Sequence, residues 1–355
     1  MEFNWQVNNY DYRNRSGNLT SEAQGKVKSK KYFPTFSVDG KEIVFKPLSK
    51  TKPFTTPYFA YSEVFWSTIL NKYFDSSTPI YQLGIIKHIE DEYPEKYHHG
   101  TTVDRLAKDD YKLLNLYELC KKYQDLLPDI SNYTNYCEVI YDYTHILRSQ
   151  FFKKHPELGQ EVAMQILCSI LRQDQNFHYE NVLFFEQGDS IEIAPMIDHE
   201  FSTMFMYLDR PKVNDARFFD TQVSLIGVPD DLKQKIRAFY IPLLEKEKRN
   251  IDIITELYPE TAREFLEQLK AFITDFSSTP LHLEDNGYLV PFNSYNFQIG
   301  HARYKEHDEK KAADLERDLE QVLITPDMVE EKISNQVLQN AQTLSTTLEK
   351  RLVLK

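Results

Sequence analysis

Three polar residues near the middle of the chain have the types and the order that phosphoryl transfer requires. Asp174 lies in a polar stretch at residues 173–180, Asn181 follows that stretch, and Asp198 closes an apolar run at residues 191–197. A loop carboxylate can orient an attacking hydroxyl, an Asn carbonyl can bind a metal, and a second carboxylate can bridge metal ions and phosphates. Asp and Asn are also common in turns for their own hydrogen bonds. Asp198 fits that simpler role less well, because a carboxylate beside an apolar strand needs a partner or a metal.

The elements around these residues are expected to be a helix, a polar loop and a hairpin. Residues 160–172 carry apolar side chains at helical spacing, namely Val162, Ala163, Ile166, Leu167, Ile170 and Leu171. Residues 182–185 and 191–197 are rich in β-forming residues, and the segment 187–190 between them supplies turn chemistry. The three polar residues are therefore expected to gather around one hairpin.

A second pair of candidate residues lies near the N-terminus. Residues 41–47 indicate a strand that presents Lys46 just before Pro47, and residues 57–74 indicate a helix with Glu63 in its second turn. From that turn Glu63 can reach back to Lys46, which would form the Lys–Glu ion pair of kinase folds. Taken singly, each is more often a solvated lysine or glutamate. Their order relative to the three polar residues favours the pairing.

Several short segments resemble the HipA-like serine/threonine kinases of bacteria. They are SEAQGK at residues 21–26, similar to the family's Ser-x-Ala-Gln-x-Lys phosphate loop, IVFKP around Lys46, the helix with Glu63, FHYEN ending at Asn181, and IAPMIDHE containing Asp198. The resemblance covers residues 10–210 well and the helical remainder only loosely.

The resemblance implies an α+β, bilobal protein-kinase-like fold with a small β-rich N-lobe and a larger, mainly helical C-lobe. It implies an enzyme that uses ATP and Mg²⁺ to phosphorylate Ser or Thr of a protein substrate, and its own phosphate loop. By the same resemblance Lys46 contacts phosphates and Glu63 fixes Lys46. The residues expected to bind the nucleotide or its metal are Ser21, Gln24, Lys26, Lys46, Ile89, Glu90, Asn181 and Asp198.

The catalytic loop departs from the family pattern. The family shows Asn-x-Asp-x-His-x-x-Asn, whereas this chain has DQNFHYEN from Asp174 to Asn181, so that Asp and Asn have exchanged places. Either Asp174 still reaches the substrate hydroxyl, or Asn176 occupies the base position and the activity is weakened. An active enzyme with Asp174 as the base is favoured, because phosphoryl transfer depends mainly on positioning and electrostatic stabilisation. His178 is expected to be a structural hydrogen-bonding residue.

Two other functional classes remain open at this stage. Lipid kinases of the phosphoinositide type also carry a loop with His and Asn followed by an Ile-Asp pair, and the segment MIDHEFS fits that description. The Lys46-Pro47 pair and the phosphate loop favour the protein kinase. The exchanged Asp and Asn also permit a catalytically weak kinase-fold binding module.

Composition is consistent with a folded catalytic unit. The chain has 355 residues, of which 41% are hydrophobic and 14% aromatic, and its net charge of −12 disfavours sequence-independent binding to nucleic acid. Its three cysteines have no metal-like spacing. No apolar run approaches the roughly 18 residues of a membrane span, and no signal segment is evident. We expect a cytoplasmic protein, with signal-less secretion as an effector still open.

The expected organisation is an N-terminal lobe at residues 1–91 and a C-terminal lobe at residues 92–355. A strand at residues 80–89 ends at Ile89 and Glu90, where a kinase hinge would offer backbone groups to adenine, and a polar linker follows at residues 93–102. Helices are expected at 230–248, 251–257, 261–276 and from Pro326 onward. The apolar stripe of the last helix favours packing on its own lobe over a partner or dimer contact.

Overall fold

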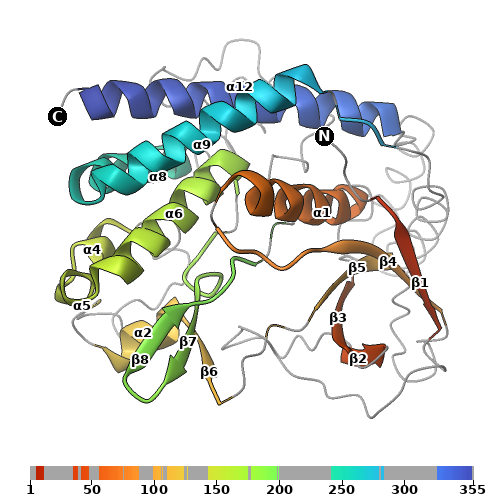
Figure 1. The fold of residues 1–355 in the computed structure, drawn as a ribbon, viewed down its shortest axis with the longest axis horizontal. Helices are drawn as coiled ribbons and strands as arrows, with labels where there is room; N and C mark the ends of the chain where they lie inside the picture. The colour runs from red at the N-terminus through yellow and green to blue at the C-terminus, as the bar shows by residue number, and fades with distance from the viewer. Residues whose placement is uncertain are drawn as a thin grey trace, which may run out of the picture.

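The described part of the chain has mixed α+β structure (Figure 1). The computed structural model describes residues 5–11, 35–38, 41–47, 56–74, 76–87, 99–104, 106, 110–123, 126, 143–174, 177–197, 199, 241–279, 281–283 and 326–353. They form a five-stranded sheet, a three-stranded sheet and a layer of helices. None of the helices in these ranges is long and apolar enough to cross a membrane.

The five-stranded sheet lies in the N-terminal part of the chain. Its strands are β1 (Val7–Asp11), β2 (Thr35–Val38), β3 (Lys41–Pro47), β4 (Gln82–Lys87) and β5 (His99–Asp104). Their order is β1-β4-β5-β3-β2, with β1 parallel to β4 and the other neighbours antiparallel. The strand expected at residues 41–47 is confirmed, and the one expected at 80–89 is present as β4.

Strand β5 corrects the expectation of a polar linker at residues 93–102, because it pairs with both β3 and β4. Thr101 and Thr102 are buried, and their β-branched side chains favour a strand. A side chain at Gly100 would collide with the Lys46 carbonyl and the Phe45 ring, so glycine permits this close approach. The division of the chain at residue 91 stays a proposal, and the sheet of its first part extends to Asp104.

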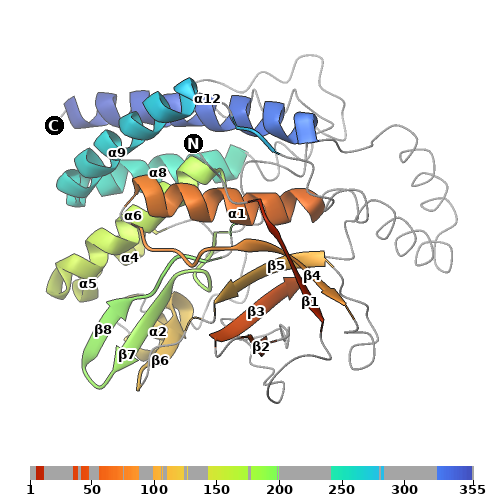
Figure 2. The same ribbon diagram turned by 45° about the vertical axis from the view of Figure 1, so that its right-hand side comes forward.

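Helix α1 (Thr56–Tyr73) lies between the five-stranded sheet and the helical layer (Figure 2). Its described side chains from Ala60 to Ser67 are all buried, which is expected for a helix covered on several faces. On the helical side the Phe65 and Phe276 ring centroids are 5.9 Å apart, and those of Phe74 and Phe265 are 5.0 Å apart. A charged residue in this helix therefore needs a partner within the protein.

The second sheet carries the expected hairpin. Its strands, in order, are β6 (Lys112–Asn115), β7 (Leu183–Gln187) and β8 (Ser190–Ile193), and α2 (Leu116–Lys122) follows β6 directly. Gly188 has a φ of 60° in the turn between β7 and β8, a conformation that glycine adopts readily. The hairpin thus confirms the prediction from turn chemistry.

The helical layer consists of α4 (Thr144–Leu147), α5 (Gln150–Lys154), α6 (Pro156–Arg172), α8 (Ile241–Leu257), α9 (Pro259–Ser278) and α12 (Pro326–Val353). The expected polar break before residue 251 is wrong, since α8 runs through it. Asn250 is buried there, and its Oδ1 accepts a hydrogen bond from the Tyr143 amide at 3.1 Å. Residues 230–240 lie outside the described ranges.

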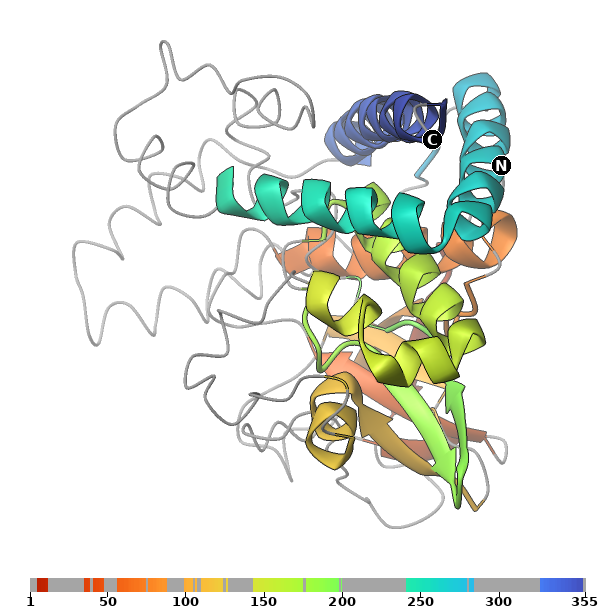
Figure 3. The same cartoon turned by 90° about the vertical axis from the view of Figure 1, so that its left-hand side faces the viewer.

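Helix α12 packs on α6, α8 and α9, and Figure 3 shows α12 and α9 side by side above α8. The stripe residues Val337, Leu344 and Leu348 are buried in this contact. These stripe residues therefore pack on other helices of the same chain, and the assignment of α12 to a C-terminal lobe stays a prediction.

Asn340 of α12 holds the last turn of α6. Its Nδ2 donates to the carbonyls of Ile170 at 3.1 Å and Leu171 at 2.6 Å. The Ile170 carbonyl also accepts from the Gln173 amide at 3.0 Å, whereas Leu171 lies in the last turn, where carbonyls lack a partner within the helix. We expect Asn340→Ala to lower the free energy of unfolding by about 1–3 kcal/mol, the cost of leaving the buried Leu171 carbonyl unpaired. Urea unfolding would measure this, with Gln342→Ala at an exposed position of the same helix as the control. Equal stability of the two variants would contradict the expectation.

Candidate active site

Lys46 of β3 and Glu63 of α1 form an ion pair, as expected from the sequence. Lys46 Nζ donates to Glu63 Oε1. The side chain of Lys46 is 13% exposed, whereas that of Glu63 is 2% exposed. The buried carboxylate therefore holds an ammonium group that still reaches the surface.

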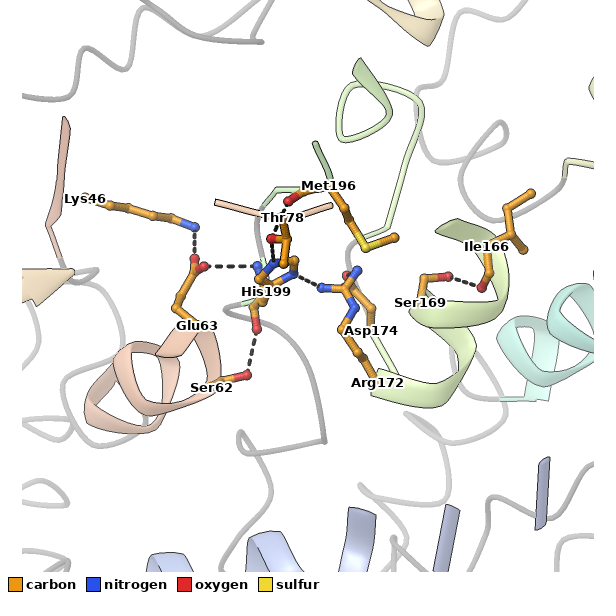
Figure 4. A network of polar contacts seen from close by, with 10 residues as sticks. All are labelled: Lys46, Ser62, Glu63, Thr78, Ile166, Ser169, Arg172, Asp174, Met196 and His199. Atoms are coloured by element: carbon orange, nitrogen blue, oxygen red, sulfur yellow. Dashed lines mark hydrogen bonds and ion pairs between the residues drawn. The ribbon is translucent and has the colours of Figure 1, made fainter. Parts of the chain in front are cut away.

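The other oxygen of Glu63 binds the backbone that follows the hairpin. Glu63 Oε2 accepts a hydrogen bond from the His199 amide at 3.2 Å, and Ser62 Oγ donates to the His199 carbonyl at 2.6 Å. Two neighbouring residues of α1 thus hold both backbone groups of residue 199 (Figure 4).

The side chain of His199 lies between Arg172 and Thr78. Arg172 Nη1 can only donate, so His199 Nδ1 is the acceptor in that hydrogen bond. The Thr78 hydroxyl donates to the Met196 carbonyl at 2.7 Å, which leaves His199 Nε2 as the donor to Thr78 Oγ1 at 2.8 Å. These partners assign a neutral imidazole with its proton on Nε2.

Asp174 is held at the end of α6 beside Arg172. Gln173 takes the left-handed conformation, with φ 53° and ψ 42°, which ends the helix and turns the chain back. The Asp174 amide then donates to the Ser169 carbonyl at 3.0 Å, and its Oδ2 lies 3.0 Å from Arg172 Nη2. Both side chains are almost fully buried, at 1% and 0% exposure, and the guanidinium offsets the cost of burying the carboxylate. A role for Asp174 as the base stays a prediction.

The two strands of the hairpin stay paired as far as Leu183 and Ala194. Phe184 pairs with Ile193, and the Ala194 amide donates to the Leu183 carbonyl at 2.8 Å. Beyond that point, the Val182 carbonyl accepts from the Leu116 amide at 2.8 Å and the Met196 amide donates to the Ser77 carbonyl at 2.9 Å. The proximity of Asn181 and Asp198 therefore stays a prediction. Asp198 itself lies outside the described residues, although Ile197 and His199 on either side are within them.

The donor types available here suit magnesium, which prefers carboxylate and amide oxygens. Asn181 is buried, and its amide donates to the His178 carbonyl at 2.8 Å. Within the described ranges no three His, Cys, Asp or Glu side chains gather as a metal site. A metal site built on Asn181 and Asp198 stays a prediction.

Of the remaining expected site residues, only His178 lies within the described ranges. His178 is buried, and its Nδ1 accepts a hydrogen bond from the Glu180 amide at 3.2 Å, in agreement with a structural role. The following residues fall outside the described ranges: Ser21, Gln24, Lys26, Ile89, Glu90 and Asn176.

Sequence reasoning missed Arg172, His199 and Thr78. Arg172 carried one local signal, a lone cation at the end of an apolar helix and two residues before Asp174. His199 and Thr78 carried none, because the contacts of His199 with Thr78 and with Glu63 each join segments more than 100 residues apart in the chain.

Comparison with known proteins gives similarity at the level of structure. No family model and no curated protein sequence matches the chain. A crystal structure of the Helicobacter pylori proinflammatory kinase CtkA is similar with a TM-score of 0.44 and 12% identity, over 89% of this chain and 95% of that one. The Shewanella oneidensis MR-1 toxin–antitoxin complex of HipA, HipB and operator DNA is similar with a TM-score of 0.27 and 13% identity, over 80% of this chain and 61% of that one.

Proposed function

We propose that this chain is a phosphotransferase that moves the γ-phosphoryl group of Mg²⁺-bound ATP to a Ser or Thr hydroxyl of a protein. The observation that carries the proposal is the Lys46–Glu63 ion pair between a sheet strand and a buried helix. A buried carboxylate fixes the direction of the lysine, and a partly exposed ammonium group can bind phosphate oxygens. The β-rich N-lobe of this enzyme would end with β5, and the helical C-lobe would follow.

The remaining nucleotide contacts are assigned from residue type and order. Asn181 and Asp198 would hold magnesium, which neutralises charge on the phosphates when it is bound. The proposed phosphate loop contains Ser21, Gln24 and Lys26, and Ile89 with Glu90 would contact adenine through backbone groups.

Asp174 would orient the acceptor hydroxyl. Phosphoryl transfer depends more on the position of that hydroxyl than on a strong base. The ion pair with Arg172 supports this role, because it keeps the charged carboxylate at the end of α6. Since Asp174 is buried, an acceptor reaches it only after the residues that cover it move. Asn176 is the alternative at this position.

The first test concerns the Lys46–Glu63 pair. We expect Lys46→Met to lower phosphoryl transfer by about 10²- to 10³-fold, the usual effect of removing one preorganised donor to a transferring group. Glu63→Gln should cost less, because Lys46 itself remains to bind the phosphate oxygens. Transfer of radiolabelled phosphate from ATP to a generic protein acceptor would measure both effects. Lys41→Met, at an exposed position of the same strand, is the control. Full transfer by Lys46→Met would refute the proposal.

A second test separates Asp174 from Asn176. If Asp174 orients the acceptor, Asp174→Ala should lower transfer by roughly 10²- to 10⁴-fold, the contribution of a positioned acid or base, with little change in ATP affinity. Asn176→Ala should cost far less. If Asn176 occupies the base position instead, Asn176→Asp should speed transfer and Asp174→Ala should hardly matter.

The same assay, run in parallel on a protein and on a phosphoinositide, also tests the substrate class. Lipid phosphorylation without protein labelling would favour the phosphoinositide-type kinase. Absence of transfer to either acceptor, together with intact ATP binding, would favour a kinase-fold binding module.

A third test concerns self-phosphorylation. Thr20, Ser21 and Ser29 lie in the proposed phosphate loop, where an added phosphate would compete with ATP for the neighbouring lysines. After incubation with ATP we expect phosphate within residues 16–37, detected by intact mass and peptide mapping. Phosphate found only elsewhere, or none, would argue against loop-based self-inhibition.

A further inference from the structure

We propose that His199 is a positioning residue that joins the Lys46–Glu63 pair to Asp174, so that the phosphate side and the acceptor side of the site are set together. This inference deepens the proposed phosphotransferase function and rests on it.

A continuous chain of polar contacts connects the two sides (Figure 4). Lys46 binds Glu63, and Glu63 binds the amide of His199. The imidazole of His199 binds Arg172, and Arg172 binds Asp174. These contacts connect β3 to α1, α1 to the segment after the hairpin, and that segment to the end of α6.

The backbone and the side chain of His199 act on different sides of the site. Its amide and carbonyl are held by Glu63 and Ser62 of α1, and any residue with a backbone N–H can make those contacts. Its side chain alone reaches Arg172 and Thr78. A side chain at residue 199 that cannot accept from Arg172 therefore cuts the connection to Asp174 and leaves the connection to α1 intact.

The charges along the chain of contacts balance. Lys46 and Arg172 are cations, Glu63 and Asp174 are anions, and the imidazole between the two ion pairs is neutral. Glu63, Arg172, Asp174 and His199 are all at most 2% exposed, so water cannot replace a lost partner. Because breaking a buried pair leaves an uncompensated charge, a shift at one end disturbs the other end.

Two substitutions each mimic one nitrogen of the imidazole. In His199→Asn the amide oxygen takes the place of Nδ1 and can accept from Arg172. In His199→Gln the amide nitrogen takes the place of Nε2 and can donate to Thr78, while the acceptor for Arg172 is lost. The two variants are therefore a matched pair that differs in the contact with Arg172.

The kinetic experiment compares kcat and KM of the two variants in the full chain. We expect His199→Gln to lower kcat by about 10- to 100-fold, the cost of a misplaced reacting group, with KM for ATP nearly unchanged. His199→Asn should stay close to wild type in both constants. Equal kcat values for the two variants, or a loss confined to KM for ATP, would overturn the inference.

Hydrogen exchange tests the connection without any catalytic readout. Glu63→Gln keeps His199 itself but offers a single acceptor oxygen for both Lys46 and the His199 amide. We therefore expect it to raise amide exchange at residues 172–182, which lie beyond the contacts of Glu63 itself. Gln342→Ala is the control. If amide exchange at residues 172–182 is unchanged in Glu63→Gln, the inference is overturned, even if the residue 199 variants fail to fold.

The two proposals fail in different ways. Wild-type protein without transfer to any acceptor, but with the expected exchange in Glu63→Gln, would refute the phosphotransferase and leave the connection standing. If the wild type is active and the two residue 199 variants have equal kcat values, the positioning role is refuted and the phosphotransferase stands.

Discussion

The burial of the Glu63 carboxylate is the constraint on which the arrangement of this protein depends. Helix α1 is covered by the five-stranded sheet and by the helical layer, so Glu63 has lost its water. A buried carboxylate is costly unless protein groups replace that water. Lys46 and the His199 amide do so, and they come from β3 and from the segment after the hairpin. One carboxylate therefore fixes three distant segments relative to each other.

The end of α6 is also fixed by buried polar contacts. The left-handed turn at Gln173 brings Asp174 back beside Arg172, and Asn340 of α12 binds the carbonyls of the same helix end. Although Asn340 is 169 residues from Leu171 in the chain, it supports the loop that carries Asp174. The C-terminal helix thus contributes to the site without entering it.

Local patterns were enough to predict several elements, but not strand β5 or most long-range partners. The Lys46–Glu63 pair was predicted from a strand, a following helix and their order relative to the three polar residues, and the hairpin was predicted from the turn at Gly188. Strand β5 was missed because its polar residues and Gly100 resemble a linker until β3 and β4 lie beside them. Asn250 resembled a helix break for the same reason, since its partner Tyr143 is 107 residues away. His199 was missed because its contacts exist only in the folded chain.

The position of His199 explains how the proposed coupling between the phosphate side and the acceptor side would help phosphoryl transfer. It directly follows Asp198, the residue proposed to hold magnesium, and α1 holds its backbone while α6 holds its side chain. Phosphoryl transfer requires the phosphates and the acceptor to be aligned at the same moment. Under the proposed function, nucleotide and metal bound at Asp198 would act on a segment already tied to both Lys46 and Asp174. A rigid neutral link between two ion pairs can transmit that alignment, because neither pair can exchange its partner for water.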